Sequence, residues 1–536
     1  MIKTVKEKEE GEKKSVNEKG VLPIVLIILD GWGITKPDPG NAISLAKTPN
    51  MDKLKKEYPY TTLFAHGKYV GLPEGQVGNS EAGHMNIGAG RIVDQDATII
   101  NKSIEDRTFF KNTALLQAIK HVKENKSRLH LMGMLSDEHS PHSDTRHIFS
   151  ILEIARKNKI KEIYIHLFTD GRDSPQYAGL KMAQELEGKL RFNEKIVTIM
   201  GRFYAMDRKK KWKRTKIAYD TLVHGTGKQC ITTITTITQS YDKKETDEFI
   251  KPHIVGKPED AKKTRITDND SIIFFNLRSD RARQLTKAFV QKDFNKYNPK
   301  AFQRKKFIKN LSFVAMTDFG PDLDSILTAY PSVDLKNTLP FMLWDLRQLY
   351  ITESEKYAHI SYFFNGGYPG KVGREDHFVL SSPNVKYYDE TPDMRSSELT
   401  EKILKNLKGN KYDFTVLNFP SPDMIGHTGN IKAAIECCER LDEHIGKIVK
   451  SYLEKNGTVI LIADHGSIEE MRDLETGDVV TKHSTNPVPF ILVNKKYKNK
   501  KLREGEILCD IAPTILKLLG KQKPAEMTGK SLIKTT

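Results

Sequence analysis

The sequence predicts an α/β protein whose sheets are mostly parallel. Three observations lead to this class: short apolar runs rich in β-branched residues, helical stretches between these runs, and polar or charged residues directly after most of them. Parallel strands are usually joined by helices, and the ligands of such sheets bind beyond the carboxyl ends of the strands. We therefore expect the functional side chains in the segments that follow the apolar runs.

Seven apolar runs are expected to form buried strands. They span residues 24–29, 129–135, 163–168, 196–200, 272–275, 414–417 and 459–463. The segments that follow contain, in the same order, Asp30, Asp137, Asp170, Arg202, Arg278, Asp423 and Asp464. One such segment would be an ordinary polar loop, but seven that offer Asp, His or Arg favour a functional site. The stretches 431–452 and 511–519 are expected to be helices, and the lysine-rich stretch 296–309 an exposed connector.

Length and composition fit a soluble protein of several domains. A chain of 536 residues is long enough for roughly two to four domains. Four cysteines without a C-x-x-C pair argue against a disulfide framework, so a reducing cytoplasm is expected. The longest strongly apolar run, residues 24–29, is too short to span a bilayer, and no signal peptide is visible. Residues 1–20 mix Lys with Glu and are expected to form a disordered tail.

The chain is strongly basic, with a formal net charge of +17. Such a charge suits either nucleic-acid binding or the attraction of a small anionic substrate. The lysines are scattered along the chain, often beside Glu, and no nucleic-acid-binding module is recognisable. Most of the surplus charge is therefore expected to be solvated surface.

The segment 77–84, VGNSEAGH, contains a candidate nucleophile, Ser80. It is not the G-x-S-x-G elbow of serine hydrolases, because the second glycine comes one residue late. Asn, Ser and Gly are also common in turns, so this segment alone favours a turn residue over a nucleophile. A metal ion beside Ser80 would reverse that preference, because coordination activates a hydroxyl that is otherwise a poor nucleophile.

Asp and His residues are concentrated at the expected strand ends. Each one alone has a structural explanation, since Asp-Gly and His-Gly pairs form turns and a lone His is more often a hydrogen-bonded structural residue. Together they supply enough oxygen and nitrogen ligands for two divalent cations, without any cysteine. This donor set suits Mn²⁺ or Zn²⁺ better than Ca²⁺, and Mg²⁺ remains open. The candidates are Asp30, Asp423, His427, Asp464, His465 and His483.

A separate group of basic residues suits a small ligand with more than one anionic group. The guanidinium fork pairs with carboxylate and phosphate, and Lys adds a point charge. Surface arginines that contribute little are the alternative, but three of the motifs directly follow apolar runs. Asp173 stands among these cations and could shuttle a proton at a substrate hydroxyl. The basic candidates are Arg172, Arg202, Arg208, Arg278, Arg281 and Lys356.

Several longer motifs carry a family resemblance. They are, in chain order, LDGWG, GLPEGQVGNSEAGH, DGRDSP, GRFYAMDRKKKW, FFNLRSDRARQLT, TESEKYAHISYFFNGG, PDMIGHTG, ADHG and HSTNPVPFILV. The chain resembles, from about residue 24 to residue 532, the cofactor-independent (2,3-bisphosphoglycerate-independent) phosphoglycerate mutases of the alkaline phosphatase superfamily. This resemblance implies an isomerase of glycolysis and gluconeogenesis. It would interconvert 3-phosphoglycerate and 2-phosphoglycerate through a phosphoserine, without added 2,3-bisphosphoglycerate.

The resemblance also implies a domain organisation. Residues 21–94 and 331–536 would form a metal-binding, alkaline-phosphatase-like domain with a parallel sheet. Residues 95–330 would form an inserted α/β transferase domain that binds the substrate. The family suggests a monomer, and no nucleic-acid or membrane partner is expected.

Residue roles follow from the same motifs. Ser80 would be the phosphorylated nucleophile and would share one metal ion with Asp30, Asp464 and His465. Asp423, His427 and His483 would hold a second ion. The glycerate would be bound by Arg172, Asp173, Arg202 and Arg208, with Asp173 as the proton shuttle, and the phosphate by Arg278, Arg281 and Lys356. The two ions would be Mn²⁺ in the first instance, with Mg²⁺, Co²⁺ or Zn²⁺ as alternatives.

Two departures from the family pattern affect this assignment. Family members usually have S-D-G-G-V-H-S-H after the run 129–135, whereas residues 136–143 are SDEHSPHS here. The substrate-binding histidine is therefore assigned to His142, with His139 as a rival. The Asn that usually follows D-H-G is Ser467 in this chain, which is expected to be benign.

Two other classes of function are alternatives. A metal-dependent phosphatase or sulfatase built on the same metal ligands would release the inorganic anion rather than an isomer. Phosphopentomutase, another relative, fits the arginine motifs less well. A basic nucleic-acid-binding protein with a degenerate enzyme fold would bind duplex DNA in a salt-dependent way, although the intact set of metal ligands argues against it.

Overall fold

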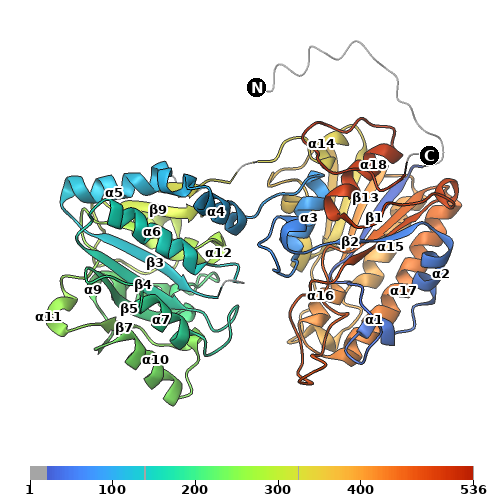
Figure 1. Cartoon of the computed structure of the whole chain (residues 1–536). Helices are drawn as coiled ribbons and strands as arrows, with labels where there is room; N and C mark the ends of the chain where they lie inside the picture. Colours follow the sequence, from blue (N-terminus) through green and yellow to red (C-terminus); the bar gives the residue numbers. More distant parts are fainter. Residues whose placement is uncertain (1–20, 138–139, 321, 324, 333, 535–536) are drawn as a thin grey trace, which may run out of the picture. The chain divides into compact units, whose positions relative to one another are not determined.

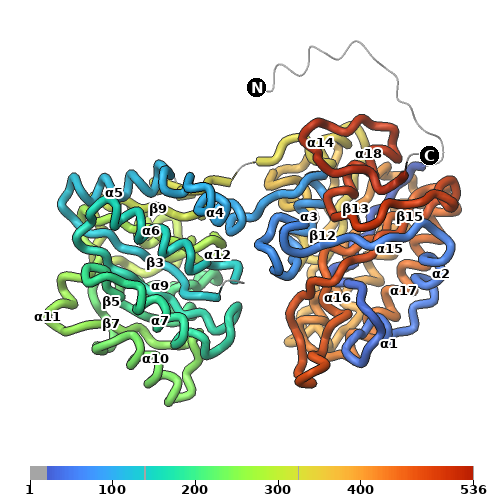
Figure 2. Tube along the Cα trace, in the orientation of Figure 1, coloured from blue at the N-terminus to red at the C-terminus, as the bar shows by residue number. Residues whose placement is uncertain are grey.

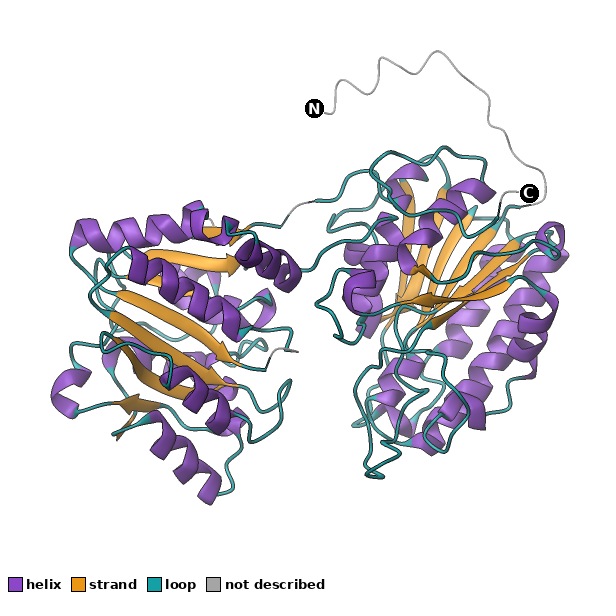
Figure 3. Ribbon diagram, in the orientation of Figure 1, coloured by secondary structure: helices purple, strands orange, loops and turns teal. Residues whose placement is uncertain are grey.

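The computed structural model describes residues 21–137, 140–320, 322–323, 325–332 and 334–534. The chain forms two compact units (Figure 1). The first unit combines the described residues of Met1–Gln95 and Val333–Thr536, and the second spans Asp96–Ser332. The tail expected at residues 1–20 lies outside the described residues. Each unit is built on a sheet with helices on both faces, so the predicted α/β class is confirmed (Figure 3).

The sheet of the first unit is mostly parallel. Within the described residues its strand order is β12-β11-β13-β1-β14-β15-β2-β16, and only β15 runs antiparallel to its neighbours. The strands are β1 Ile24–Leu29, β2 Tyr60–Phe64, β11 Arg347–Glu353, β12 Arg374–Leu380, β13 Phe414–Phe419, β14 Thr458–Ile462, β15 Val488–Val493 and β16 Glu506–Ile507. Strands from both ends of the chain therefore share one sheet, and Figure 2 shows the blue N-terminal trace among the orange and red C-terminal segments.

Helices of the first unit bury apolar faces against this sheet. They are α1 Ala42–Leu45, α2 Pro49–Glu57, α3 Ser80–Ala89, α14 Leu339–Met342, α15 Ser396–Lys408, α16 Ser421–Gly426, α17 Ile431–Glu454 and α18 Ile511–Leu518. The longest, α17, begins after Asn430, whose side chain accepts a hydrogen bond from Ala433 N at 3.3 Å. Its residues Leu441, Ile445 and Ile448 recur at helical spacing and are fully buried.

The second unit has a sheet of its own. Its strand order within the described residues is β10-β9-β8-β3-β4-β5-β7-β6, with an antiparallel pairing only between β5 and β7. The strands are β3 Leu129–Leu135, β4 Ile163–Thr169, β5 Glu194–Gly201, β6 Lys228–Cys230, β7 His253–Val255, β8 Ser271–Phe274, β9 Ser312–Thr317 and β10 Leu327–Tyr330. The helices are α4 Asp96–Glu105, α5 Thr113–Asn125, α6 Thr145–Lys157, α7 Gly179–Glu187, α8 Arg202–Ala205, α9 Trp212–His224, α10 Thr233–Asp242, α11 Pro258–Ala261, α12 Ser279–Val290 and α13 Phe294–Tyr297.

Alternation along β3, LHLMGML, explains why all of its residues except His130 are apolar. Leu129 and Leu131 belong to the core on one face of the sheet, which includes residues of α5 and α6. Met132 and Met134 belong to the core on the other face, which includes residues of α9 and α12. A strand covered on both faces has no solvent side and therefore needs no polar position.

All seven predicted runs form strands, and α17 and α18 occupy the predicted helical stretches. The lysine-rich stretch 296–309 begins at the end of α13 and then has no helix or strand. No helix in the described part of the chain combines the length and apolar character needed to cross a membrane.

Candidate metal centre and active site

Three neighbouring parallel strands place the carboxylates of the first unit at one edge of its sheet. The register pairs Leu29 of β1 with Phe419 of β13, and Ile28 of β1 with Ile462 of β14. Asp30 follows β1 directly, and Asp423 and Asp464 follow the other two strands within a few residues. These three carboxylates are at most 2% exposed. Segments about 400 residues apart in the chain thus meet at one site.

Ser80 lies at the beginning of a helix rather than in an isolated turn. It is the first residue of α3, and Asn79 is the N-cap, whose side chain accepts a hydrogen bond from Ala82 N at 2.9 Å. Gly83 allows this helix to approach the loop after β14, because a Cβ there would lie 2.6 Å from the backbone oxygen of Asp464. The second glycine of VGNSEAGH, Gly83, therefore allows close packing around Ser80.

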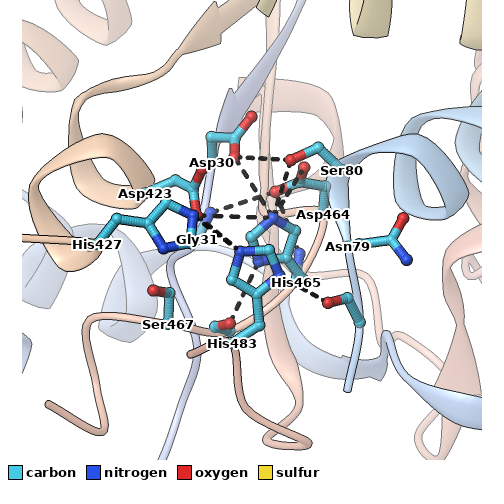
Figure 4. A network of polar contacts seen from close by, with 12 residues as sticks. Asp30, Gly31, Asn79, Ser80, Asp423, His427, Asp464, His465, Ser467 and His483 are labelled. Atoms are coloured by element: carbon cyan, nitrogen blue, oxygen red, sulfur yellow. Dashed lines mark hydrogen bonds and ion pairs between the residues drawn. The ribbon is translucent and has the colours of Figure 1, made fainter. Parts of the chain in front are cut away.

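The Ser80 hydroxyl contacts three functional groups. Its Oγ lies 3.2 Å from Asp30 Oδ1, 3.0 Å from His465 Nε2 and 2.7 Å from Lys356 Nζ. Figure 4 shows Ser80 facing Asp30, Asp464 and His465. The hydroxyl is thus surrounded by carboxylate and imidazole groups, the ligand types predicted for the first metal ion.

Lys356 brings a positive charge into this cluster. Its Nζ lies 2.7 Å from Asp30 Oδ1 and 2.6 Å from Asp423 Oδ2. Burial alone would lower the pKa of this ammonium, but Asp30, Asp423 and Asp464 outweigh burial and hold the pKa above its usual value. In turn, burial would raise the pKa of Asp423, but Lys356 and the nearby histidines hold it well below its usual value.

Asp423, His427 and His483 form a second group of potential ligands. Asp423 Oδ1 lies 3.1 Å from His483 Nε2 and 3.5 Å from His427 Nε2, and the two Nε2 atoms are 3.3 Å apart. One ligand atom from each of these residues fits within a span of 4.8 Å, and the same holds for Asp30, Asp423 and His465. Both groups are close enough to converge on a cation.

The three imidazoles are oriented as metal ligands would be. Each has its Nδ1 near a backbone oxygen: Gly466 O for His465, Thr481 O for His427 and Gly78 O for His483. A carbonyl only accepts, so each Nδ1 is placed to donate its proton there, and each Nε2 faces the cluster, where it can offer a lone pair once it is deprotonated. Asp423 Oδ1 is buried and accepts no hydrogen bond from any described residue. These observations fit divalent cations bound by oxygen and nitrogen.

His465 responds to the same concentration of negative charge. Burial would lower its pKa, but Asp464, Asp30 and Asp423 outweigh burial and raise the pKa to about 9. Three ionised carboxylates within one buried cluster need compensation by positive charge, which divalent cations can supply.

The predicted substrate residues of the second unit also converge. His142 Nε2 lies 3.0 Å from Asp173 Oδ2 and 3.2 Å from Arg202 Nη2. Arg202 is 2% exposed and contacts Asp173 at 2.5 Å, as well as Asp170. Burial would raise the pKa of Asp173, but His142 and Arg202 hold it below its usual value. Asp170 also accepts the backbone N–H groups of Arg172 and Asp173 at 3.2 and 3.0 Å and so shapes the DGRD loop.

The remaining arginines surround this group. Burial, together with the charges of Arg202 and Arg208, lowers the pKa of Arg281 to about 10. Arg208 Nη1 donates to Asp280 Oδ2 at 2.5 Å, and Arg278 lies close enough to His142 to help lower its pKa. Arg202 is buried, Arg278 and Arg281 are half-buried, and Arg172 and Arg208 are exposed. Such a concentration of guanidinium groups favours an anionic ligand.

The predicted phosphate-binding residues fall into two groups. Lys356 belongs to the Ser80 cluster of the first unit, whereas Arg278 and Arg281 belong to the arginine cluster of the second. His142 is buried among the arginines, and its rival His139 lies outside the described residues.

Two buried residues at the metal centre carry no obvious sequence signal. Asn418 donates to Asp30 Oδ2 at 2.8 Å and lies 3.1 Å from His84 Nε2. His84 Nδ1 in turn lies 2.9 Å from Ser80 O and 3.2 Å from Asp464 Oδ2. Neither His84 nor Asn418 is among the candidate residues that the sequence indicates. The one available signal was an amide inside the apolar strand FTVLNF.

Comparison with known proteins identifies relatives along nearly the whole chain. A family profile described as the Metalloenzyme superfamily matches residues 22–523. Proteins named 2,3-bisphosphoglycerate-independent phosphoglycerate mutase are 46% identical in Clostridium botulinum and 47% identical in Clostridium kluyveri. Each alignment covers 96% of this chain, with 99% of the first relative and 100% of the second.

A solved structure shares the fold. The phosphoglycerate mutase of Leishmania mexicana, described at low cobalt concentration, superposes with a TM-score of 0.79 at 30% identity and covers 97% of this chain and 99% of its own. The superfamily match and the buried Asp and His clusters together support divalent metal binding. The chain belongs to the family of 2,3-bisphosphoglycerate-independent phosphoglycerate mutases.

Proposed function

We propose that this isomerase interconverts 3-phosphoglycerate and 2-phosphoglycerate through a phosphoserine on Ser80, without 2,3-bisphosphoglycerate. The observation that carries the proposal is the position of Ser80 Oγ, buried beside Asp30, His465 and Lys356. Ser80 also begins a ten-residue helix, whose N-terminal N–H groups favour a phosphate there. The family relationship supplies the substrate class.

The first unit is proposed to bind two divalent ions, most simply Mn²⁺. Asp30, Ser80, Asp464 and His465 would hold one ion, and Asp423, His427 and His483 the other. Bound there, the cations would lower the pKa of the Ser80 hydroxyl and offset the charge of the phosphoryl oxygens.

The chain's own residues would divide the remaining work. The Ser80 hydroxyl first loses its proton to solvent. Ser80 Oγ then forms a bond to phosphorus while the bond from phosphorus to the glycerate oxygen breaks, and Lys356 stabilises negative charge at Oγ. Reversal at the other glycerate hydroxyl returns the phosphoryl group. Arg172, Arg202 and Arg208 would hold the glycerate between the two transfers, and Arg278 and Arg281 would bind its phosphate.

Asp173 is the proposed proton carrier. The glycerate oxygen released in the first transfer gains a proton, and the hydroxyl that attacks in the second loses one. Asp173 and His142, 3.0 Å apart, would together hold one proton, give it to the released glycerate oxygen, and take one back from the attacking hydroxyl. The lowered pKa keeps Asp173 ionised, which suits the second of these steps, and the first would use the proton on His142.

An enolase-coupled assay tests the proposal. The purified chain with Mn²⁺ should convert 3-phosphoglycerate without added 2,3-bisphosphoglycerate, and Ser80→Ala should abolish turnover and phosphorylation of the Ser80 peptide. Ser44→Ala, in α1 and outside the cluster, is the matched control. Activity that survives Ser80→Ala refutes the proposal, and release of inorganic phosphate instead of isomer would indicate a phosphatase.

The preference for Mn²⁺, a cytoplasmic location, a monomeric state and the lack of a nucleic-acid partner are also proposed. The neutral-imidazole and carboxylate donor set supports Mn²⁺ over harder cations. The metal preference is tested by measuring the activity of metal-stripped protein after addition of Mn²⁺, Mg²⁺, Co²⁺ or Zn²⁺. The monomeric state is tested by measuring the mass with light scattering.

A further inference from the structure

Glu469 is a fully buried carboxylate beside the metal ligands. It lies four residues after His465 and is 0% exposed. It forms no ion pair with a basic side chain of the described residues, so hydrogen bonds alone satisfy its charge. A buried, ionised carboxylate needs such donors, because desolvation without compensation is strongly unfavourable.

Four donors from three separate segments converge on this carboxylate. Oε2 accepts the backbone N–H of Gly33 at 3.0 Å and that of Ser467 at 2.7 Å. Oε1 accepts the hydroxyl of Ser484 and the side-chain amide of Asn486, the latter at 3.0 Å. Both carboxylate oxygens therefore accept hydrogen bonds from loop residues rather than from solvent.

Each of the three segments carries candidate metal ligands. Gly33 is three residues after Asp30, Ser467 is two residues after His465, and Ser484 directly follows His483. The first two segments would serve one ion and the third would serve the other. The carboxylate therefore connects the loops of both proposed ion sites.

Two glycines make room for the carboxylate. A Cβ on Gly33 would lie 2.2 Å from Glu469 Cδ, and a Cβ on Gly466 would lie 2.4 Å from Glu469 Oε1. Gly33 ends the motif LDGWG and Gly466 ends the motif ADHG. Metal binding explains the Asp and His residues of these motifs but not their final glycines. The close approach gives these glycines a physical reason to be there.

We propose that Glu469 is a positioning residue that sets the geometry of both ion sites by fastening their ligand loops to one carboxylate. This role rests on the proposed two-ion site. Glu469 itself would contact neither the ions nor the substrate. Four hydrogen bonds to a charged acceptor hold the loops more firmly than neutral contacts would. Partners of this kind typically change metal affinity by about 10- to 100-fold when they are removed.

Glu469→Gln is the informative substitution. Glutamine keeps the size and one acceptor oxygen but places an NH₂ group against two of the four donors. An NH₂ group turned toward Gly33 and Ser467 would meet two backbone N–H groups that only donate. Turned the other way, it could donate to the Ser484 hydroxyl but would still face the side-chain NH₂ of Asn486. At least one of the four hydrogen bonds is lost in either orientation. Glu470→Gln is the matched control, because the neighbouring Glu470 is exposed and its side chain accepts, among the described residues, one hydrogen bond, from Asn486 Nδ2 at 2.9 Å.

Mn²⁺ binding to the full chain is measured by calorimetry and by the electron paramagnetic resonance signal of free Mn²⁺. The wild type should bind two ions, and Glu469→Gln should bind both about 10- to 100-fold more weakly. Ser484→Ala, which keeps the charge, should weaken mainly the ion held by His483. Excess Mn²⁺ should restore kcat of Glu469→Gln with an unchanged KM for 3-phosphoglycerate, whereas general structural damage would not be restored.

The possible failures are distinguishable. If the wild type binds two ions and Glu469→Gln binds both with wild-type affinity, Glu469 is not a positioning residue and the proposed function stands. If the wild type binds no Mn²⁺, the two-ion proposal falls and the role of Glu469 falls with it. If Glu469→Gln does not fold, Ser484→Ala decides, and unchanged affinity for both ions in that variant refutes the role.

Discussion

Replacing Lys356 with methionine probes how buried charge is balanced around Ser80. The Lys356 ammonium lies 2.7 Å from Asp30 Oδ1 and 2.6 Å from Asp423 Oδ2, and the lysine is only 4% exposed. Methionine keeps an unbranched apolar stem and removes the charge. Removing one partner of a buried ion pair typically destabilises a protein by about 3–5 kcal/mol, because the other partner is left uncompensated.

This loss corresponds to a measurable shift in melting temperature. The first unit has roughly 300 residues, and an unfolding entropy of about 2.1 cal/mol/K per residue then gives about 1.6 °C per kcal/mol. Without divalent ions, the midpoint of the first unit should therefore fall by about 5–8 °C.

Mn²⁺ should reduce the effect, because bound cations would replace the missing positive charge. If the loss with saturating Mn²⁺ is only about 1–2 kcal/mol, the thermodynamic cycle requires Mn²⁺ to bind more tightly by about 2–3 kcal/mol, or roughly 30- to 150-fold. Turnover should nevertheless fall, since the same ammonium lies 2.7 Å from Ser80 Oγ.

Scanning calorimetry of metal-stripped and Mn²⁺-saturated protein measures both midpoints, and a Mn²⁺ titration measures the affinity. Lys408→Met, at an exposed position of α15, is the control for loss of a lysine. An equal loss of stability with and without Mn²⁺ would refute the reasoning, and so would weaker Mn²⁺ binding by Lys356→Met.

Three further substitutions test other parts of the structure. Burial lowers the pKa of His147 to about 4, so the unfolded chain binds a proton that the folded chain rejects, and stability is lost as pH falls from 6.5 toward 4. His147→Gln should flatten the melting temperature of the second unit between about pH 7 and pH 5, and an unchanged slope contradicts this. Burial raises the pKa of Glu353 to about 7, so stability is lost as pH rises from 4.5 through 7. Glu353→Gln, which keeps an acceptor for Arg395 N, should melt higher than wild type near pH 8 but not near pH 4.5, and equal midpoints at both values count against it. Arg202→Lys removes the fork that contacts Asp170 and Asp173 and should raise KM for 3-phosphoglycerate by about tenfold, which a coupled assay measures; an unchanged KM argues against Arg202 as a substrate ligand.

Strands buried on both faces could be predicted from the sequence. The run 24–29 and the run 129–135 coincide with β1 and β3, because a central parallel strand is mostly apolar. The edge strand β12, with the sequence REDHFVL, could not be found in this way, since it pairs on one side only and keeps charged residues. β11 was missed for a related reason: its sequence RQLYITE begins and ends with charged residues.

The same division applies to the metal centre. Asp30, Asp464 and His465 stand directly at strand ends, so the sequence order alone indicates them. Asn418, His84 and Glu469 contact the candidate ligands or their loops, and each has a partner far away in the chain: Asp30 for Asn418, Asp464 for His84 and Gly33 for Glu469. Ser467 contributes its backbone N–H to Glu469, which any residue except proline can offer. The expectation that Ser467 is benign therefore has a physical basis, although it stays a prediction.

The three carboxylates of the centre share one arrangement that bears on the choice of cation. Asp464 Oδ1 accepts the N–H groups of Gly31 and His465 at 3.2 and 3.1 Å, and Asp30 Oδ2 accepts from Asn418. Their other oxygens, like Asp423 Oδ1, lie near the imidazoles. None of the three carboxylates thus has both oxygens free for an ion. One oxygen of Asp464 accepts backbone N–H groups, and one oxygen of Asp423 accepts from Lys356. Asp30 accepts from Asn418 through one oxygen and from Lys356 through the other. Ca²⁺ prefers 6–8 oxygen ligands and often takes both oxygens of a carboxylate. Single oxygens combined with imidazole nitrogens instead favour a smaller transition-metal ion such as Mn²⁺ or Zn²⁺.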